Sequence, residues 1–114
     1  MKYMMMICDV ETQQTGPGDP GFEEIMAAYG AFTELVQELG VLVDSSQLLP
    51  TSAATTVRVR DGKTVTTDGP FAETKEQFGG YYILDCKDLD QAIELAAKIP
   101  SATGGSIEVR PLMG

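Results

Sequence analysis

The pattern of apolar and polar residues along the chain predicts short strands and two amphipathic helices. Residues 3–8 form a continuous apolar run that is too short for a helix, so it predicts a central strand buried on both faces. Apolar and polar residues alternate strictly over residues 55–60. The Asp61-Gly62 pair that follows is a strong hairpin signal, with residues 63–67 as the returning strand. Further strands are expected at residues 41–49, 81–85 and 106–110.

Two segments carry apolar residues at three- and four-residue steps, which is typical of amphipathic helices. The first helix is expected to begin at Asp19 as N-cap, with Pro20 in its first turn, and to end at Gly40. The second is expected to start at Asp88, from which Gln91 lies at capping-box spacing. The apolar stripe of the first helix is Phe22, Ile25, Met26, Tyr29, Phe32, Val36 and Leu39, and that of the second is Leu89, Ala92, Ile93, Ala96 and Ile99.

The order of these elements indicates an α+β fold of the ferredoxin-like kind, with an antiparallel sheet and both helices on one face. Residues 1–114 are expected to form a single domain whose core is large enough to need no disulfide or metal. Two helices can cover only one face of the sheet, whereas residues 3–8, 41–49 and 81–84 carry apolar side chains on both faces. The uncovered face therefore predicts a homodimer with the sheet faces apposed.

Charge and hydropathy narrow the range of partners. Seventeen acidic residues against eight basic ones give a net charge of −9, which repels phosphate backbones and argues against a nucleic-acid ligand. The chain contains no apolar run near the roughly 20 residues that a membrane helix needs. These features predict a soluble, cytoplasmic protein that binds neither nucleic acid nor membrane.

Composition also removes several kinds of catalysis. The chain has no histidine, so imidazole acid–base chemistry, Ser-His-Asp triads and His-ligated zinc are excluded. Its only cysteines, Cys8 and Cys86, are expected at opposite ends of the sheet as free thiols. We therefore expect no metal site and no cofactor.

The segment from residue 66 to residue 80 is dense in polar side chains and allows two interpretations. Asp68, Glu73 and Lys75 together could supply an acid, a base and a cation to one small pocket. Alternatively, residues 68–70 form a simple turn in which Asp68 bonds back to the backbone and Phe71 fills the core. The sequence favours the turn as the minimum role and leaves a ligand contact at Asp68 open.

Two glycines and two tyrosines follow this segment. Gly79 and Gly80 are expected to break the chain before the strand at residues 81–85. Tyr81 and Tyr82 are neighbours on that strand, so their rings point to opposite faces of the sheet. One ring faces the helices as core, and the other faces the open side, where it could line a ligand cavity or a dimer seam.

Three blocks of sequence carry a family resemblance: residues 68–76 (DGPFAETKE), 79–82 (GGYY) and 107–111 (IEVRP). Together with residues 28–32, 55–62 and 88–92, they make the chain resemble the DGPF group of the YCII-related proteins. The resemblance covers nearly the whole chain. It implies a ferredoxin-like subunit that pairs sheet to sheet into a dimeric α/β barrel.

The resemblance leaves the activity undecided. The broader family is associated with an Asp–His pair suggested to be catalytic, and Asp68 matches that aspartate, but this chain has no histidine to complete the pair. One hypothesis is a cavity that binds a small organic molecule, with Asp68 as polar anchor or general base. The other residues assigned to that site are Phe71, Glu73, Lys75, Tyr81 and Tyr82. The alternative is a non-catalytic accessory module, because members of this group resemble domains joined to, or found beside, extracytoplasmic-function sigma factors.

Overall fold

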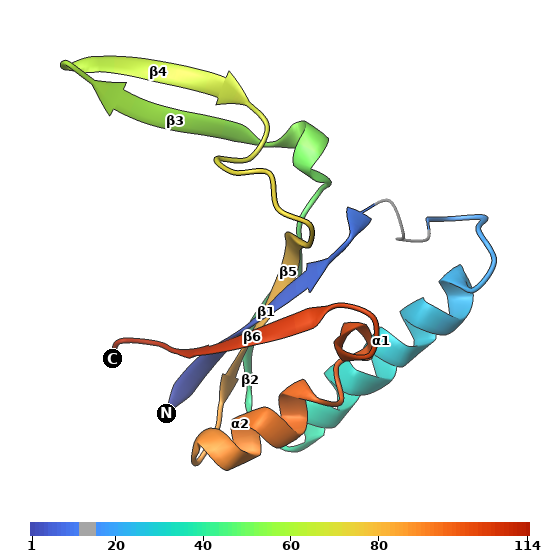
Figure 1. Cartoon of the computed structure of the whole chain (residues 1–114). Coiled ribbons are helices and arrows are strands. Elements are labelled where there is room, and N and C mark those ends of the chain that lie inside the picture. Colours follow the sequence, from blue (N-terminus) through green and yellow to red (C-terminus); the bar gives the residue numbers. More distant parts are fainter. Residues whose placement is uncertain (12–15) are drawn as a thin grey trace.

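A four-stranded antiparallel sheet with two helices on one face forms the body of the protein (Figure 1). The computed structural model describes residues 1–11 and 16–114. The strand order β2-β5-β1-β6 is the ferredoxin-like arrangement, so the predicted fold class is confirmed. The strands of this sheet are β1 (Lys2–Asp9), β2 (Leu42–Gln47), β5 (Gln77–Asp85) and β6 (Ser106–Pro111). The helices are α1 (Phe22–Glu38) and α2 (Leu89–Ala96), with 3-10 turns η2 (Thr51–Ala53) and η3 (Pro100–Ala102).

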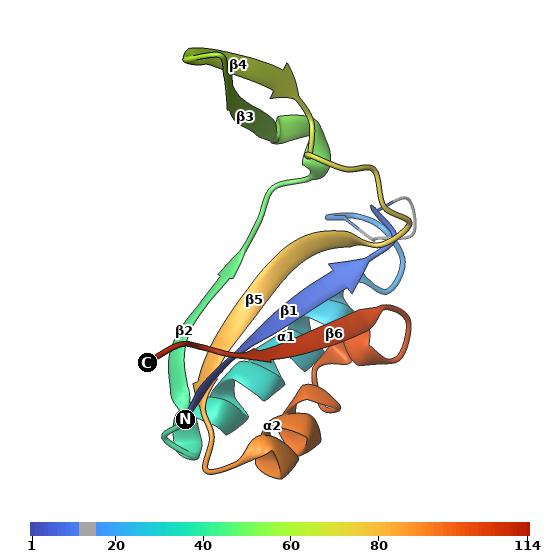
Figure 2. The same cartoon turned by 60° about the vertical axis from the view of Figure 1, so that its left-hand side comes forward.

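The hydrophobic core lies between the helices and one face of the sheet (Figure 2). Tyr3, Met5 and Ile7 of the central strand β1 point into this core. Phe32 of α1 packs edge-on against Tyr82 of β5, with ring centroids 5.0 Å apart. The other buried apolar residues are Val36, Val41, Leu84, Cys86, Ala92, Leu95, Ala96 and Ile99. Within the two described ranges, neither helix has the length and apolarity that a bilayer crossing requires.

The opposite side of the sheet, which we call the open face, has an apolar centre. Met4, Met6 and Cys8 of β1 point to it, and the register sets Ile83 and Tyr81 beside the two methionines. These five side chains are half-buried among one another, and no helix of the described chain covers them. The first strand is therefore central, as predicted, but it is buried on one face only within a single chain. Polar residues border the open face, Asp44 and Ser46 on β2 and Ser106, Glu108 and Arg110 on β6.

The start of α1 differs from the prediction. The helix begins at Phe22 after Gly21, which occupies the N-cap position with φ 83°, a left-handed conformation that favours glycine. Asp19 is not the cap, because its Oδ2 accepts a hydrogen bond from the Gly16 amide at 2.7 Å in the preceding turn. Gly40, with φ 72°, ends the helix as predicted.

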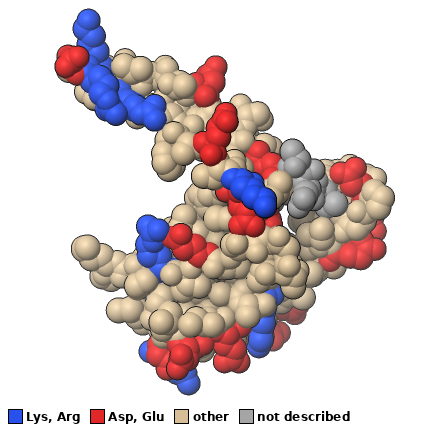
Figure 3. Space-filling model, in the orientation of Figure 1, with Lys and Arg blue, Asp and Glu red and all other residues tan. Residues whose placement is uncertain are grey.

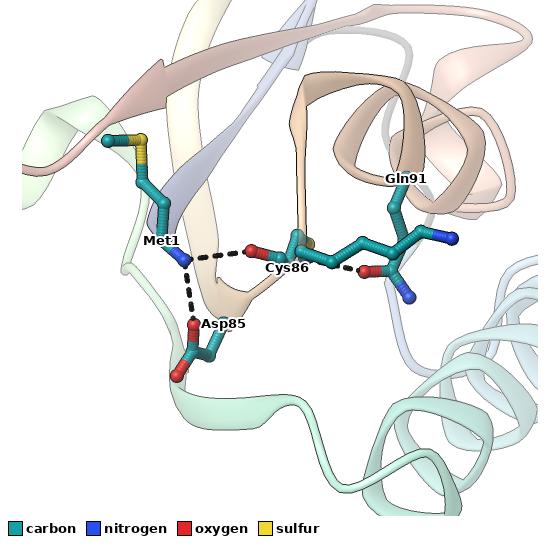
Figure 4. A network of polar contacts seen from close by, with 5 residues as sticks. Met1, Asp85, Cys86 and Gln91 are labelled. Atoms are coloured by element: carbon teal, nitrogen blue, oxygen red, sulfur yellow. Dashed lines mark hydrogen bonds and ion pairs between the residues drawn. The ribbon is translucent and has the colours of Figure 1, made fainter.

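The start of α2 confirms the sequence signal. Asp88 Oδ1 accepts the Gln91 amide at 2.8 Å, and Gln91 Oε1 in turn accepts the Lys87 amide at 2.8 Å. Figure 4 shows this end of the sheet, where the amino group of Met1 also donates to the Cys86 carbonyl oxygen at 2.9 Å. The cap orders the connection into α2, and the Met1 contact joins the start of β1 to that connection.

The predicted apolar stripe of the second helix is confirmed at Ala92, Ala96 and Ile99 and wrong at Leu89 and Ile93. Ala92, Leu95 and Ala96 are buried, whereas Leu89 is 50 % and Ile93 is 53 % exposed. The side of α2 that carries Ala92, Leu95 and Ala96 therefore faces the core, and Leu89 and Ile93 lie toward the outer side. The prediction failed at these two positions because the apolar arc of this short helix, which also includes the buried Leu95, is wider than the face that the sheet covers.

Strand β5 runs through Gly79 and Gly80, so the predicted break is wrong. Gly80 is buried, and a Cβ at this position would lie 3.1 Å from the Ser46 carbonyl oxygen of β2. The Gly79 carbonyl oxygen accepts the Leu48 amide at 2.9 Å. These glycines allow neighbouring backbone to approach closely within a strand, which is a known role of glycine in sheets.

A β-hairpin, residues 55–68, projects from the body and forms what we call the arm (Figures 1 and 2). Its strands are β3 (Thr55–Arg60) and β4 (Lys63–Asp68), paired antiparallel. Asp61 and Gly62 both have positive φ, 53° and 74°, as the predicted two-residue turn requires. The arm makes the chain extended: its radius of gyration is 16.0 Å, against about 13 Å for a compact domain of similar length.

The turn before β6 provides a test of the packing at the end of β1. A Cβ at Gly105 would overlap the Cys8 carbonyl oxygen and the Asp9 carboxylate, whereas a Cβ at Gly104 meets open space. We expect Gly105→Ala to lower the free energy of unfolding by about 1–3 kcal/mol. The control Gly104→Ala is expected to be neutral or slightly stabilising. Urea denaturation of both variants measures the difference, and equal stabilities would contradict this packing.

Candidate functional site

A cleft of about 570 Å³ opens between the N-terminal half of α1 and the sheet, at the end where β1 finishes. This volume lies within the range of small-molecule sites in proteins. Ile25 and Met26 of α1 form one wall, and Ile7 of β1 and Tyr82 of β5 contribute from the sheet. The cleft is on the helix side of the sheet, away from the open face.

The cleft exists because small residues lie beneath the first turns of α1. On the helix side of the sheet, Ser45 of β2 and Gly80 of β5 lie here, and their side chains are too short to fill the space below the helix. Residues of the predicted helix stripe consequently stay uncovered at this end. Ile25 is 42 % and Met26 is 46 % exposed, although both were expected in the core. Leu39, at the other end of the stripe, is also exposed.

Two hydroxyl groups meet at the inner part of the cleft. The hydroxyls of Tyr29 from α1 and Ser101 from η3 form a hydrogen bond, and both side chains are half-buried. Burial is the main cause that raises the pKa of Tyr29, although the bond to Ser101 opposes the shift. Tyr29 is therefore a neutral phenol at physiological pH, able to donate or accept a hydrogen bond.

The charged residues of the cleft are both acidic. Asp9 and Glu11 lie at the rim, and no lysine or arginine lines the cleft in the part of the chain that the structure describes. Glu11 is engaged by the loop after β2, since its carboxylate oxygens accept the Thr51 amide at 2.8 Å and the Thr51 hydroxyl at 2.7 Å. Asp9 packs against Gly105. A lining that contains apolar side chains and whose charged residues are acidic favours neutral or positively charged ligands over anions.

The two tyrosines predicted for the site lie on opposite faces of β5, as expected. Tyr82 faces the helices, and its hydroxyl bonds to Thr33 Oγ1 at 2.8 Å. Tyr81 belongs to the open face, where its hydroxyl donates to Asp44 Oδ2 at 3.2 Å. The Asp44 charge raises the pKa of Tyr81. Both residues border the cleft, but only Tyr82 contributes to the core beneath it.

The other predicted site residues lie outside the cleft. Asp68 ends the arm, and Phe71, Glu73 and Lys75 follow it in an exposed segment. Phe71 is 81 % exposed, so the expectation that it fills the core is wrong. Within one chain the structure does not gather these four residues with the tyrosines. The proposed site role of this segment stays a prediction.

The turn at residues 68–70 is held by backbone contacts. The Gly69 amide donates to the Ala54 carbonyl oxygen at 2.8 Å, and the Gly69 carbonyl oxygen accepts the Thr56 hydroxyl at 2.7 Å. Gly69 has φ 93°, so glycine is required there. The Asp68 carboxylate accepts no hydrogen bond from the described residues, which differs from the expected cap.

The thiols are not candidates for nucleophilic chemistry. Cys8 and Cys86 are both free and lie at opposite ends of the sheet, as predicted. Burial raises the pKa of each thiol, and the charge of Glu108 adds to the effect at Cys8. In residues 1–11 and 16–114, no three acidic or thiol side chains come together as a metal site.

Comparison with known proteins shows which family the chain belongs to. The family described as YCII-related domain matches residues 1–114. The chain belongs to the YCII-related domain family. It is also 45 % identical over 114 residues to the uncharacterized protein R00369 of Rhizobium meliloti (strain 1021), and the match covers 98 % of this chain and 92 % of that protein.

Sequence reasoning missed the cleft of this YCII-related protein. Tyr29 was assigned to the helix stripe, and Asp9 and Ser101 carried no signal of their own. The available signal was the Gly79-Gly80 pair inside a strand pattern, because interior strand glycines mark places where backbone or a ligand approaches closely. It was interpreted as a chain break instead.

Asp68 and Asp88 form a matched pair of aspartates for testing the turn. Asp68→Ala is expected to change the free energy of unfolding by less than about 0.5 kcal/mol, because the carboxylate is exposed and unbonded in the described chain. Asp88→Ala removes the α2 cap and is expected to lower the free energy of unfolding by about 1 kcal/mol. Urea denaturation compares the variants. A loss at Asp68 as large as that at Asp88 would contradict the backbone-held turn.

Proposed function

We propose that this protein binds a small organic molecule, neutral or positively charged with an apolar portion, in the cleft under α1. The single observation that carries the proposal is the 570 Å³ cleft, whose walls hold exposed Ile25 and Met26. Exposed apolar side chains gathered in a hollow are typical of ligand sites. The Tyr29–Ser101 hydroxyl pair supplies a polar contact that would orient the ligand.

The chemistry supports binding more than turnover. The chain has no histidine. Glu11, one of the two acidic residues that line the cleft, already uses both carboxylate oxygens to accept hydrogen bonds from Thr51. Asp68, the aspartate that matches the family's suggested catalytic position, lies on the arm rather than in the cleft. We therefore propose a binding protein, and a role for Asp68 in binding requires a second chain to bring it near a cleft.

The ligand proposal is tested with three small probes of matched shape: benzylamine, benzyl alcohol and benzoate. Amide chemical-shift titration of the full chain is expected to show saturable shifts around Tyr29 and Gly80 with the amine and the alcohol, and weaker ones with the anion. Ile25→Lys places a positive charge in the cleft wall and is expected to weaken benzylamine binding by about fivefold.

The matched control is Leu39→Lys, which substitutes an exposed apolar residue at the C-cap of the same helix, outside the cleft. It is expected to leave benzylamine binding unchanged. The proposal fails if none of the three probes gives saturable shifts at millimolar concentration, or if both lysine variants weaken binding equally.

We further propose that the working form is a homodimer in which the open faces of two sheets pack together. The support is the apolar centre of the open face, Met4, Met6, Tyr81 and Ile83, with polar residues along both edges. An apolar core with a polar rim is the usual anatomy of a protein interface. In a two-fold symmetric dimer, the open face of each copy would be covered by the open face of the other.

A pair of variants tests the sheet-to-sheet pairing. Met6→Glu puts a charge at the centre of the open face and is expected to convert the dimer to monomer, because an unpaired charge cannot be buried there. Ser46→Glu, on the edge strand, is expected to leave the dimer largely intact. Sedimentation velocity at micromolar concentration distinguishes them. Equal behaviour of both variants, with the wild type dimeric, would place the interface elsewhere.

A second candidate function is an accessory module that contacts a basic partner such as an extracytoplasmic-function sigma factor. The observation in its favour is the acidic surface of the body, to which the exposed face of α1 contributes Glu23, Glu24, Glu34 and Glu38 (Figure 3). Such a partner would bind outside the cleft. The Ile25→Lys variant would then leave partner binding unchanged, which separates the two functions.

A further inference from the structure

The arm is a regular hairpin that nothing in the described chain covers. Every residue of β4 is exposed, and Val57 and Val59 of β3 are 60 % and 61 % exposed. An isolated two-stranded hairpin is at best marginally stable in water. Contacts of Gly69 with Ala54 and Thr56 hold only the base of the arm. Its outer part therefore needs a surface supplied from outside the chain.

The two faces of the arm differ in character. Alternation puts Val57 and Val59 on one face of the arm. Their cross-strand partners on the same face are Thr66 and Thr64. Arg58, Arg60 and Lys63 are on the other face. β-branched residues on one side of a hairpin form a surface suited to packing. The valine face is therefore the side that a covering surface would contact.

The direction of the arm indicates where that surface lies. In both views the arm leans to the side of the sheet away from the helices, the side of the open face (Figures 1 and 2). A six-residue strand spans about 20 Å. A second copy seated on the open face would thus lie within reach of the arm, and two-fold symmetry would place its own arm around the first copy.

Charge favours the same partner. The arm contains three of the eight basic residues of the chain and only two of its seventeen acidic ones. Figure 3 shows lysine and arginine gathered on the arm and acidic side chains over the body. With the valine face in contact, the basic side chains would lie on the far face of the arm. Their charge would then attract an acidic second copy over a distance and favour its approach to the arm.

We propose that each arm clasps a second copy of this chain through its Val57 and Val59 face. The proposal rests on the homodimer of the proposed function and adds the arm as its second contact surface. The clasp would also bring the exposed segment with Asp68 and Phe71 toward the partner. Within one chain this segment lies away from the cleft. The arm would then be stable in the dimer and frayed in a monomer.

The test uses the full chain and an isosteric double variant, Val57→Thr with Val59→Thr, which keeps strand propensity and removes apolar contact. Its dimer dissociation constant, from sedimentation equilibrium, is expected to rise at least about tenfold. Val65→Thr, on the opposite face of the arm and 44 % exposed, is the matched control and is expected to change it by less than about twofold.

Hydrogen exchange of the wild-type arm is the second readout. Amides of residues 55–68 are expected to be protected where the protein is dimeric and to lose that protection on dilution to monomer. A double variant that dimerises as tightly as wild type would overturn the clasp while leaving the homodimer standing. Arm amides that exchange without protection in a purified dimer would also overturn the clasp and leave the homodimer standing. A wild type that is monomeric at every concentration would refute the homodimer itself.

Discussion

The organising constraint of this structure is that two helices cover one face of a four-stranded sheet whose apolar residues occupy both faces. The alternation of β1 sends Met5 into the core and Met4 and Met6 to the open face. Exposed apolar patches of this kind are associated with interaction sites. The proposed homodimer and the proposed clasping arm both respond to this constraint, since each would cover surface that one chain leaves exposed.

The cleft arises on the other face of the sheet, where the residues beneath α1 are too small to fill the space. Gly80 allows β5 to approach β2, and its missing side chain leaves space beneath the first turns of α1. The helix continues above this space with Ile25 and Met26 unburied. A filled core there would need larger residues on β5, which the close contact of Gly80 with the Ser46 carbonyl oxygen excludes.

The sequence predicts features whose causes are local. The Asp61-Gly62 turn and the Asp88 cap each depend on backbone conformation or on a hydrogen bond a few residues away, and both are present. The fold class follows from the order of such elements. The family resemblance extends the prediction of fold to the whole chain, since the YCII-related domain covers residues 1–114.

Features set by distant contacts were not predictable in the same way. Phe71 is apolar but lies on a connection whose path depends on the arm, so its exposure cannot be read from its type. The cleft residues Tyr29 and Ser101 are 72 positions apart and meet only through the packing of α1 against η3. Asp68, the residue singled out by motif, is placed by the arm and hence by whatever the arm contacts.

Sedimentation equilibrium of the unaltered full chain over micromolar concentrations tests the central claim most directly, because we propose that a second copy covers the open face. We predict a mass close to twice the 12.2 kDa of one chain, with dissociation only on strong dilution. A mass that stays at that of one chain throughout this range would contradict the account, since the apolar centre of the open face would then remain exposed to water.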